Sequence, residues 1–277
     1  MRAESRERRD AFFGAIGKDP IVMGILNLTP DSFSDGGRFQ SPDLSLAHAR
    51  QMARDGCAIL DIGAESTRPG AAPVPEKEEI ARLERTLEQI SNGVDAPFSI
   101  DTTKANVAAF ACRLGAIVVN DVWGLQKDPG MASAVADTEA GVVITHNRAE
   151  KDADIDIIAD MRRFFDRSLE MAARAGIPQD RIILDPGIGF AKTARQNLLA
   201  ITGIAKLADY HLPVLIGASR KRFLGSLTGD GVEGSLVGSI AVNLAAAAAG
   251  ASIFRVHDVA ENVAALKLFA KLRLAAA

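Results

Sequence analysis

Residues 97–121 read PFSIDTTKANVAAFACRLGAIVVND, and this stretch contains the unit on which the fold prediction rests. A short apolar run, Pro97–Ile100, is followed by an amphipathic segment, Lys104–Leu114, and then by a second apolar run, Ala116–Val119. Short β-branched runs that alternate with longer amphipathic segments are typical of strand–helix units in a parallel sheet. A polar residue follows each apolar run, at the position where functional groups lie in such units.

The same alternation extends along the whole chain and predicts eight such units. The predicted strands are Ile21–Leu26, Ala58–Ile62, Pro97–Ile100, Ala116–Val119, Val142–Thr145, Arg181–Leu184, Pro213–Ile216 and Ser252–Val256. The predicted helices between them include Leu44–Asp55, Glu76–Ile90, Lys104–Leu114, Ile155–Ala175 and Gly234–Ala249. No Pro/Ser-rich linker interrupts the series. We therefore expect an α/β protein with a single (β/α)₈ TIM barrel over residues 21–277, preceded by a short helical N-terminal extension, residues 1–20.

Composition excludes several classes of function. The net charge of −3 over 277 residues provides no global positive field for nucleic acid. The most apolar stretch, Ser239–Phe254, is too short and too weakly hydrophobic to span a bilayer. The N-terminus has no apolar core of a signal peptide, and Cys57 and Cys112 lack metal-type spacing. We expect a cytoplasmic protein with two reduced thiols and no membrane or nucleic-acid partner.

Polar residues follow every predicted strand. They are Asn27, Asp61 with Glu65, Asp101, Asn120 with Asp121, His146, Asp185, the run Ser219–Arg222, and Arg255 with His257. Each of them alone could be a turn former or a helix cap. In a barrel, however, the carboxyl ends of all strands share one mouth, where the loops supply catalysis. Together these residues predict an active site.

Three of these residues suit a nitrogen heterocycle. Asp101 and Asp185 each end an apolar strand, and Asn120 follows the strand after Asp101. Taken singly, Asp101 is better explained as a cap. Taken together, carboxylates can accept parallel hydrogen bonds from an amidine-like edge, and Asn supplies both a donor and an acceptor. The combination favours a pterin- or guanine-like ring.

The last two strands point to phosphate. Ser219 is a natural N-cap for the helix after the seventh strand, and the exposed N–H groups there form an anion site. Arg220 and Arg222 are interpreted as a solvated basic patch, whereas Lys221 is expected to face the mouth; a Schiff-base role for it stays open. Barrels often bind phosphate after strands seven and eight, so Arg255 and His257 suit a diphosphate. Any metal would arrive with the phosphates.

Two loops complete the predicted site. Asn27 opens NLTPDSFSDGG, which is interpreted as a mobile lid over the substrate. The loop AESTRPGAAPVP carries Arg68, an anion or ring-stacking contact. His48 and His211 receive no role, and the role of His146 stays open.

These motifs resemble the dihydropteroate synthase family. The resemblance rests on NLTPDSFSDGG, ESTRPGA, SIDTTK, VND, DPGIGF, SRKRF and RVH, in the family's order across nearly the whole chain. It implies a homodimeric (β/α)₈ barrel that condenses (7,8-dihydropterin-6-yl)methyl diphosphate with 4-aminobenzoate. It also implies inhibition by sulfonamides, which mimic 4-aminobenzoate.

Carried over motif by motif, the resemblance assigns each part of the site. The pterin would be held by Asp101, Asn120, Asp185 and Lys221. The diphosphate would be held by Asn27, Thr67, Arg255 and His257, with Asn27 also a ligand of Mg²⁺. The 4-aminobenzoate would contact Phe33, Arg68, Pro69, Phe190 and Ser219. The catalytic residues would be Asp101, Lys221 and Asp35, the last assisting the leaving group or the amine.

The chain departs from the family pattern at three places: DIGAEST, ITHNR and GFAKT stand where the family has Gly before the Glu, a Met-His-Met type segment and GFGKT. Three other functions remain open at this point. They are a pterin-binding methyltransferase-type barrel, a Schiff-base aldolase that uses Lys221, and a non-catalytic pterin-binding paralogue.

Overall fold

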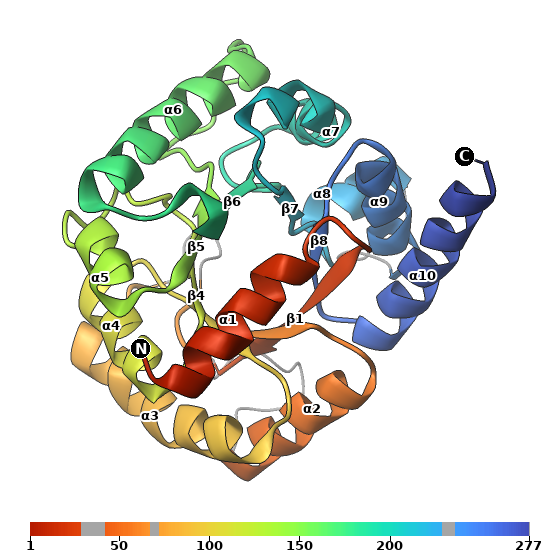
Figure 1. Ribbon diagram of the computed structural model, residues 1–277. Coiled ribbons are helices and arrows are strands. Elements are labelled where there is room, and N and C mark those ends of the chain that lie inside the picture. The colour runs from red at the N-terminus through yellow and green to blue at the C-terminus, as the bar shows by residue number, and fades with distance from the viewer. Residues whose placement is uncertain (29–41, 67–71, 229–235, 277) are drawn as a thin grey trace.

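Eight parallel strands form a closed ring in the computed structural model, which describes residues 1–28, 42–66, 72–228 and 236–276 (Figure 1). The strands are β1 (Ile21–Asn27), β2 (Ile59–Gly63), β3 (Phe98–Asp101), β4 (Val118–Asp121), β5 (Gly141–Thr145), β6 (Ile182–Asp185), β7 (Leu215–Ile216) and β8 (Ile253–Val256). Their order in the sheet is β6-β5-β4-β3-β2-β1-β8-β7. A parallel bridge between Leu184 and Val214 joins β6 to β7 and closes the ring.

The ring is surrounded by helices, except for the first helix, which crosses one end of it (Figure 1). They are α1 (Ala3–Ala15), α2 (Pro42–Arg54), α3 (Glu76–Gly93), α4 (Ala105–Leu114), α5 (Met131–Thr138), α6 (Ile157–Ala175), α7 (Ala194–Thr202), α8 (Arg222–Thr228), α9 (Leu236–Ala248) and α10 (Val259–Ala276), with 3₁₀ turns at Gln179–Arg181 and Ile204–Tyr210. The predicted (β/α)₈ barrel is confirmed. Within the described residues, no helix is both long enough and apolar enough to cross a bilayer.

The observed strands extend to the polar residues that were predicted to follow them. Asp101 and Asp185 are the last residues of β3 and β6, and Asn120 lies inside β4. The register pairs Asp101 with Asn120 on the neighbouring strand. These functional candidates are therefore held by the sheet itself rather than by loops, which makes their relative positions rigid.

The interior of the barrel is apolar at the amino ends of the strands. A buried cluster there consists of Phe12, Ile21, Met23, Ile59, Ile117, Val118, Val143, Ile183, Leu215 and Ile253. Helix α1 runs across this end of the ring, and its Phe12 is buried with the strand residues (Figure 1). The extension therefore acts as a plug. A second, larger apolar core fills the space between the strands and the outer helices.

Candidate functional site

A buried carboxylate, Asp61 of β2, organises the carboxyl half of the barrel interior. Its Oδ1 accepts a hydrogen bond from Ser99 Oγ at 2.5 Å. Its Oδ2 accepts from Asn120 Nδ2 at 2.9 Å and from Arg255 Nε at 2.6 Å. Asp61 is fully buried, so these three partners compensate the cost of removing its charge from water. The carboxylate thereby fixes side chains from β3, β4 and β8.

Two acceptor atoms beside this network lack a partner. The guanidinium of Arg255 donates through Nη2 to Asp101 Oδ2 at 2.7 Å. The other Asp101 oxygen, Oδ1, and Asn120 Oδ1 are buried and have no hydrogen-bond partner within the part of the chain that the structure describes. An unsatisfied buried acceptor costs about 1–3 kcal/mol. Neighbouring acceptors of this kind suit a ligand that presents adjacent N–H groups.

Burial changes the protonation of the carboxylates in the site. It raises the pKa of Asp101 to about 7, against the opposing effect of Arg255. Burial also raises the pKa of Asp185, while the hydrogen bond from Gly187 N and the charge of Lys221 act in the opposite direction. Strongly shifted carboxylates at the mouth of a barrel are typical of an active site.

The end of β6 and the loop that follows it place Asp185, Gly187 and Phe190 at the mouth of the barrel. Gly187 N donates to Asp185 Oδ1 at 2.8 Å. Gly187 has a φ of +68°, and a Cβ there would lie 1.9 Å from the carbonyl oxygen of His146, so only glycine fits. Lys221 Nζ lies 4.6 Å from the centre of the Phe190 ring, within range of a cation–π contact. Lys221 therefore lies against the loop that follows β6.

The segment after β7, which was predicted to form an anion site, has a different local structure from the one predicted. Helix α8 begins at Arg222, so Ser219 is not its N-cap. Instead, the Ser219 hydroxyl accepts a hydrogen bond from His257 N at 3.2 Å and lies 3.1 Å from His257 Nδ1. Arg220 is exposed, in agreement with its interpretation as solvated, and its guanidinium also pairs with Asp258 at 2.5 Å. The Ser219 hydroxyl contacts a residue that is distant in the sequence, and a rule for local helix capping cannot predict such a contact.

His257 is neutral at physiological pH. Burial, reinforced by the positive charges of Arg255 and Arg220, lowers its pKa to about 3. It can therefore donate one N–H to an anion but does not add a second positive charge beside Arg255.

The remaining predicted site residues fall into two groups. Asn27 is partly buried and ends β1, in register with Gly63 of β2. The lid and second-loop residues Phe33, Asp35, Thr67, Arg68 and Pro69 lie outside the described residues. No group of three or more His, Cys, Asp or Glu side chains in the described ranges is arranged to hold a metal ion.

Sequence reasoning missed two groups of residues. Asp61 was noted only as a polar residue at a strand end, although a carboxylate inside the apolar run ILDIG is itself a signal of inward-facing chemistry. His146, left open, is buried beside Lys192 and Asp160. The sequence carries no signal for this contact, because it joins three separate elements.

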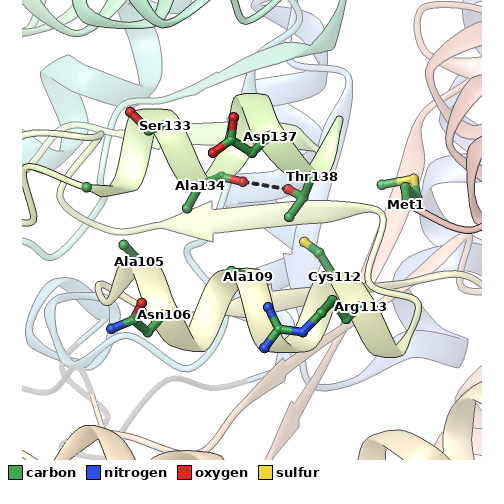
Figure 2. Close-up of a pocket in the computed structure, with 11 residues that line it drawn as sticks. Met1, Ala105, Asn106, Ala109, Cys112, Arg113, Ser133, Ala134, Asp137 and Thr138 are labelled. Atoms are coloured by element: carbon green, nitrogen blue, oxygen red, sulfur yellow. Dashed lines mark hydrogen bonds between the residues drawn. The ribbon is translucent and has the colours of Figure 1, made fainter.

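A hollow elsewhere on the described surface is separate from this site. It lies on the outside of the barrel and has a volume of about 520 Å³. Residues of α4 and α5 line it, among them Asn106, Arg113 and Asp137 (Figure 2). None of the polar residues at the strand ends lines it. The candidate site is therefore the mouth of the barrel, where the buried acceptors lie.

Comparison with known proteins agrees with this geometry. The sequence profile described as "Pterin binding enzyme" matches residues 23–257. The dihydropteroate synthase of Bacillus subtilis is 45% identical over 239 residues, covering 86% of this chain and 84% of that protein. Dihydropteroate synthase from Clostridium difficile, solved in the presence of pteroic acid, superposes with a TM-score of 0.88 at 42% identity, covering 93% of this chain and 98% of that one. The Xanthomonas albilineans enzyme, solved with 4-aminobenzoic acid, gives a TM-score of 0.86 at 40% identity, with coverages of 92% and 93%. The chain therefore belongs to the pterin-binding enzyme family, and within it to the dihydropteroate synthases.

Proposed function

We propose that this chain condenses (7,8-dihydropterin-6-yl)methyl diphosphate with 4-aminobenzoate to give 7,8-dihydropteroate and diphosphate. The observation that carries the proposal is a pair of buried acceptors, Asp101 Oδ1 and Asn120 Oδ1, beside Asp185 in the mouth of the barrel. Neither atom has a hydrogen-bond partner among the described residues. The amidine-like N–H groups of a pterin are donors of the kind these atoms require. Related synthases were solved with pteroic acid and with 4-aminobenzoic acid, the product-like and acceptor compounds of this reaction.

In this proposal the pterin ring is held by Asp101, Asn120, Asp185 and Lys221. The first two accept from its N–H groups while Asp61 and Arg255 fix their other atoms. Lys221, which lies over Phe190, is a donor for the ring's acceptor atoms. The ring is thus recognised by both donors and acceptors, which discriminates against rings that present only one kind.

The diphosphate lies toward Arg255, His257 and Asn27, with Thr67 from the second loop. The guanidinium supplies the positive charge, and neutral His257 supplies a hydrogen bond. The Asn27 amide oxygen at the end of β1 fits Mg²⁺, which accepts one protein oxygen together with phosphate oxygens. When bound, Mg²⁺ would neutralise charge on the leaving diphosphate.

The reaction is an SN1-like substitution. The bond between the pterin methylene carbon and the diphosphate oxygen breaks first, and both electrons leave with the diphosphate. Asp101 and Asp185 stabilise the positive charge left on the pterin methylene. The aniline nitrogen of 4-aminobenzoate then forms the new C–N bond and loses a proton. Asp35 assists the leaving group or accepts this proton.

The 4-aminobenzoate lies against Phe190 and Ser219, together with Phe33, Arg68 and Pro69 of the two loops. Phe190 offers an aromatic face, and Ser219 offers a hydroxyl for the carboxylate. Sulfonamides compete for the same place because they copy the length and the anionic end of 4-aminobenzoate.

The proposed enzyme is a cytoplasmic homodimer. Large apolar side chains are exposed on neighbouring helices: Leu198 and Leu199 on α7, Val237 on α9, and Leu268 and Leu272 on α10. Exposed apolar groups gathered on adjacent helices favour a protein–protein interface. Cys57 and Cys112 are buried and unpaired, which suits a reducing compartment.

The test incubates the purified chain with Mg²⁺, the pterin diphosphate and 4-aminobenzoate, and omits each component in turn. Diphosphate release and dihydropteroate formation are followed together. Formation of dihydropteroate that depends on 4-aminobenzoate supports the proposal. Pterin binding without turnover would instead favour a non-catalytic paralogue or a methyltransferase-type barrel, and trapping of Lys221 by borohydride with a carbonyl substrate would favour an aldolase.

A further inference from the structure

A buried lysine lies behind the pterin side of the site. Lys192, in the loop between β6 and α7, is 3% exposed. Its Nζ lies 2.8 Å from the carbonyl oxygen of Gly187 and 2.8 Å from His146 Nδ1. The carbonyl oxygens of Phe190 and His146 lie farther away, at 3.3 and 3.4 Å. No step of the proposed reaction uses this lysine.

The contacts of Lys192 and His146 indicate which of their nitrogen atoms carry protons. His146 Nε2 lies 3.1 Å from Asp160 Oδ2 on α6, so Nε2 carries the proton and donates to that carboxylate. The other ring nitrogen, Nδ1, is then an acceptor for Lys192. Only the ammonium form of Lys192 has three N–H groups to satisfy Nδ1, the Gly187 oxygen and one of the more distant carbonyls. A neutral amine would leave one of these acceptors unpaired.

The loop that Lys192 holds carries three groups of the site. Gly187 N donates to Asp185 Oδ1, and the Phe190 ring lies under Lys221 Nζ. Gly189 packs against the side chain of Lys221, since a Cβ there would lie 3.1 Å from its Cδ. The Lys192 ammonium contacts the carbonyl oxygens on both sides of this short segment, at Gly187 and Phe190.

We propose that Lys192 is a positioning residue, whose ammonium group, anchored through His146 to Asp160, holds the 187–190 segment so that Asp185 and Lys221 are aligned for the pterin. This inference rests on the proposed function, because it deepens the role of the same site. Its consequence is that pterin affinity depends on the charge of a residue that does not touch the pterin.

The charge of Lys192 can change near neutral pH. Burial lowers the pKa of Lys192 to about 7, and the nearby cations Lys221 and Arg148 lower it further, whereas Asp185 and Asp160 oppose the shift. His146 takes no part in the titration, because burial and Lys192 lower its pKa to about 3. As pH rises through about 7, Lys192 loses its proton and the segment loses one of its constraints.

The test measures binding of pteroic acid by calorimetry from pH 6 to pH 9, for the wild-type chain and the variant Lys192→Met. The matched control is Lys206→Met, which removes an exposed lysine. Comparing variant with wild type at each pH cancels the titration of Asp101, which both proteins share. We expect Lys192→Met to bind about 10-fold more weakly at pH 6, the order of effect expected when a charge-assisted hydrogen bond is removed. The difference should shrink toward pH 9 without vanishing, because a neutral Lys192 keeps two N–H donors that Met lacks, and Lys206→Met should follow the wild type.

The inference would be overturned if the ratio of the wild-type affinity to the Lys192→Met affinity stays constant with pH, or if the two proteins bind equally at every pH. Lys192 would then be a purely structural residue. Wild-type protein that does not bind pteroic acid would overturn the proposed function itself. If Lys192→Met does not fold, the test uses the wild-type protein alone. The titration of Lys192 is followed by NMR of ¹⁵N-lysine-labelled protein, and its midpoint is compared with the pH at which affinity for pteroic acid falls on the alkaline side. The inference requires the two values to agree, and a mismatch would overturn it.

Discussion

Replacing Asp61 by asparagine separates the charge of the buried network from its hydrogen bonds. The amide oxygen can take the place of Oδ2 and accept from Asn120 and Arg255, while the amide nitrogen donates to Ser99 Oγ. Only the negative charge is then lost. Breaking a buried ion pair costs about 3–5 kcal/mol. Because Arg255 keeps Asp101 at 2.7 Å, we expect the lower end of this range, about 3 kcal/mol.

The assay is urea unfolding followed by the fluorescence of Trp123, the single tryptophan, which lies directly after β4. For a chain of this size the expected loss corresponds to a fall in Tm of about 5–10 °C. Asp209→Asn is the matched control, since Asp209 also pairs with an arginine, Arg162, but on the surface. Exposed pairs contribute little, so the control should unfold like the wild type. Equal unfolding midpoints for the two variants would refute the reasoning that burial gives Asp61 its importance.

Three further perturbations test other parts of the structure. Ala191 has a φ of +41°, so Ala191→Gly should raise the free energy of unfolding by about 0.5–1 kcal/mol in the same urea assay, and a loss of stability would contradict the strain assigned there. Because the pKa of Asp101 is raised to about 7, kcat/KM for the pterin substrate should fall as pH falls through that value, since the protonated acid loses an acceptor. This acid limb should be absent in Asp101→Asn, and its persistence would assign it to another group. Phe12→Ala should lower the free energy of unfolding by about 3–5 kcal/mol and leave KM unchanged, and a raised KM would mean that the plug also shapes the site.

The sequence predicted the elements of the barrel and the end of it that carries chemistry, because both follow from local patterns. Each predicted strand overlaps an observed one, and Asp101, Asn120 and Asp185 were selected from their position alone. The sequence did not predict which of these side chains contact each other. Arg255 reaches Asp61 from 194 positions away, and no local pattern contains that pair. Lys192 has the appearance of a solvated loop residue until β5 and α6 are placed around it.

The plug formed by α1 has a consequence for the order of events. Phe12 and its neighbours fill the amino end of the barrel interior, so within the described part of the chain the proposed site opens at the mouth. The acceptors Asp101 and Asn120 are buried, whereas Phe190 is partly exposed. In the proposed site, a molecule bound at the buried acceptors arrives before a molecule that lies against Phe190 and covers it. For the proposed reaction we therefore expect sequential turnover, in which the pterin enters first and the joined product leaves with its aminobenzoate end leading.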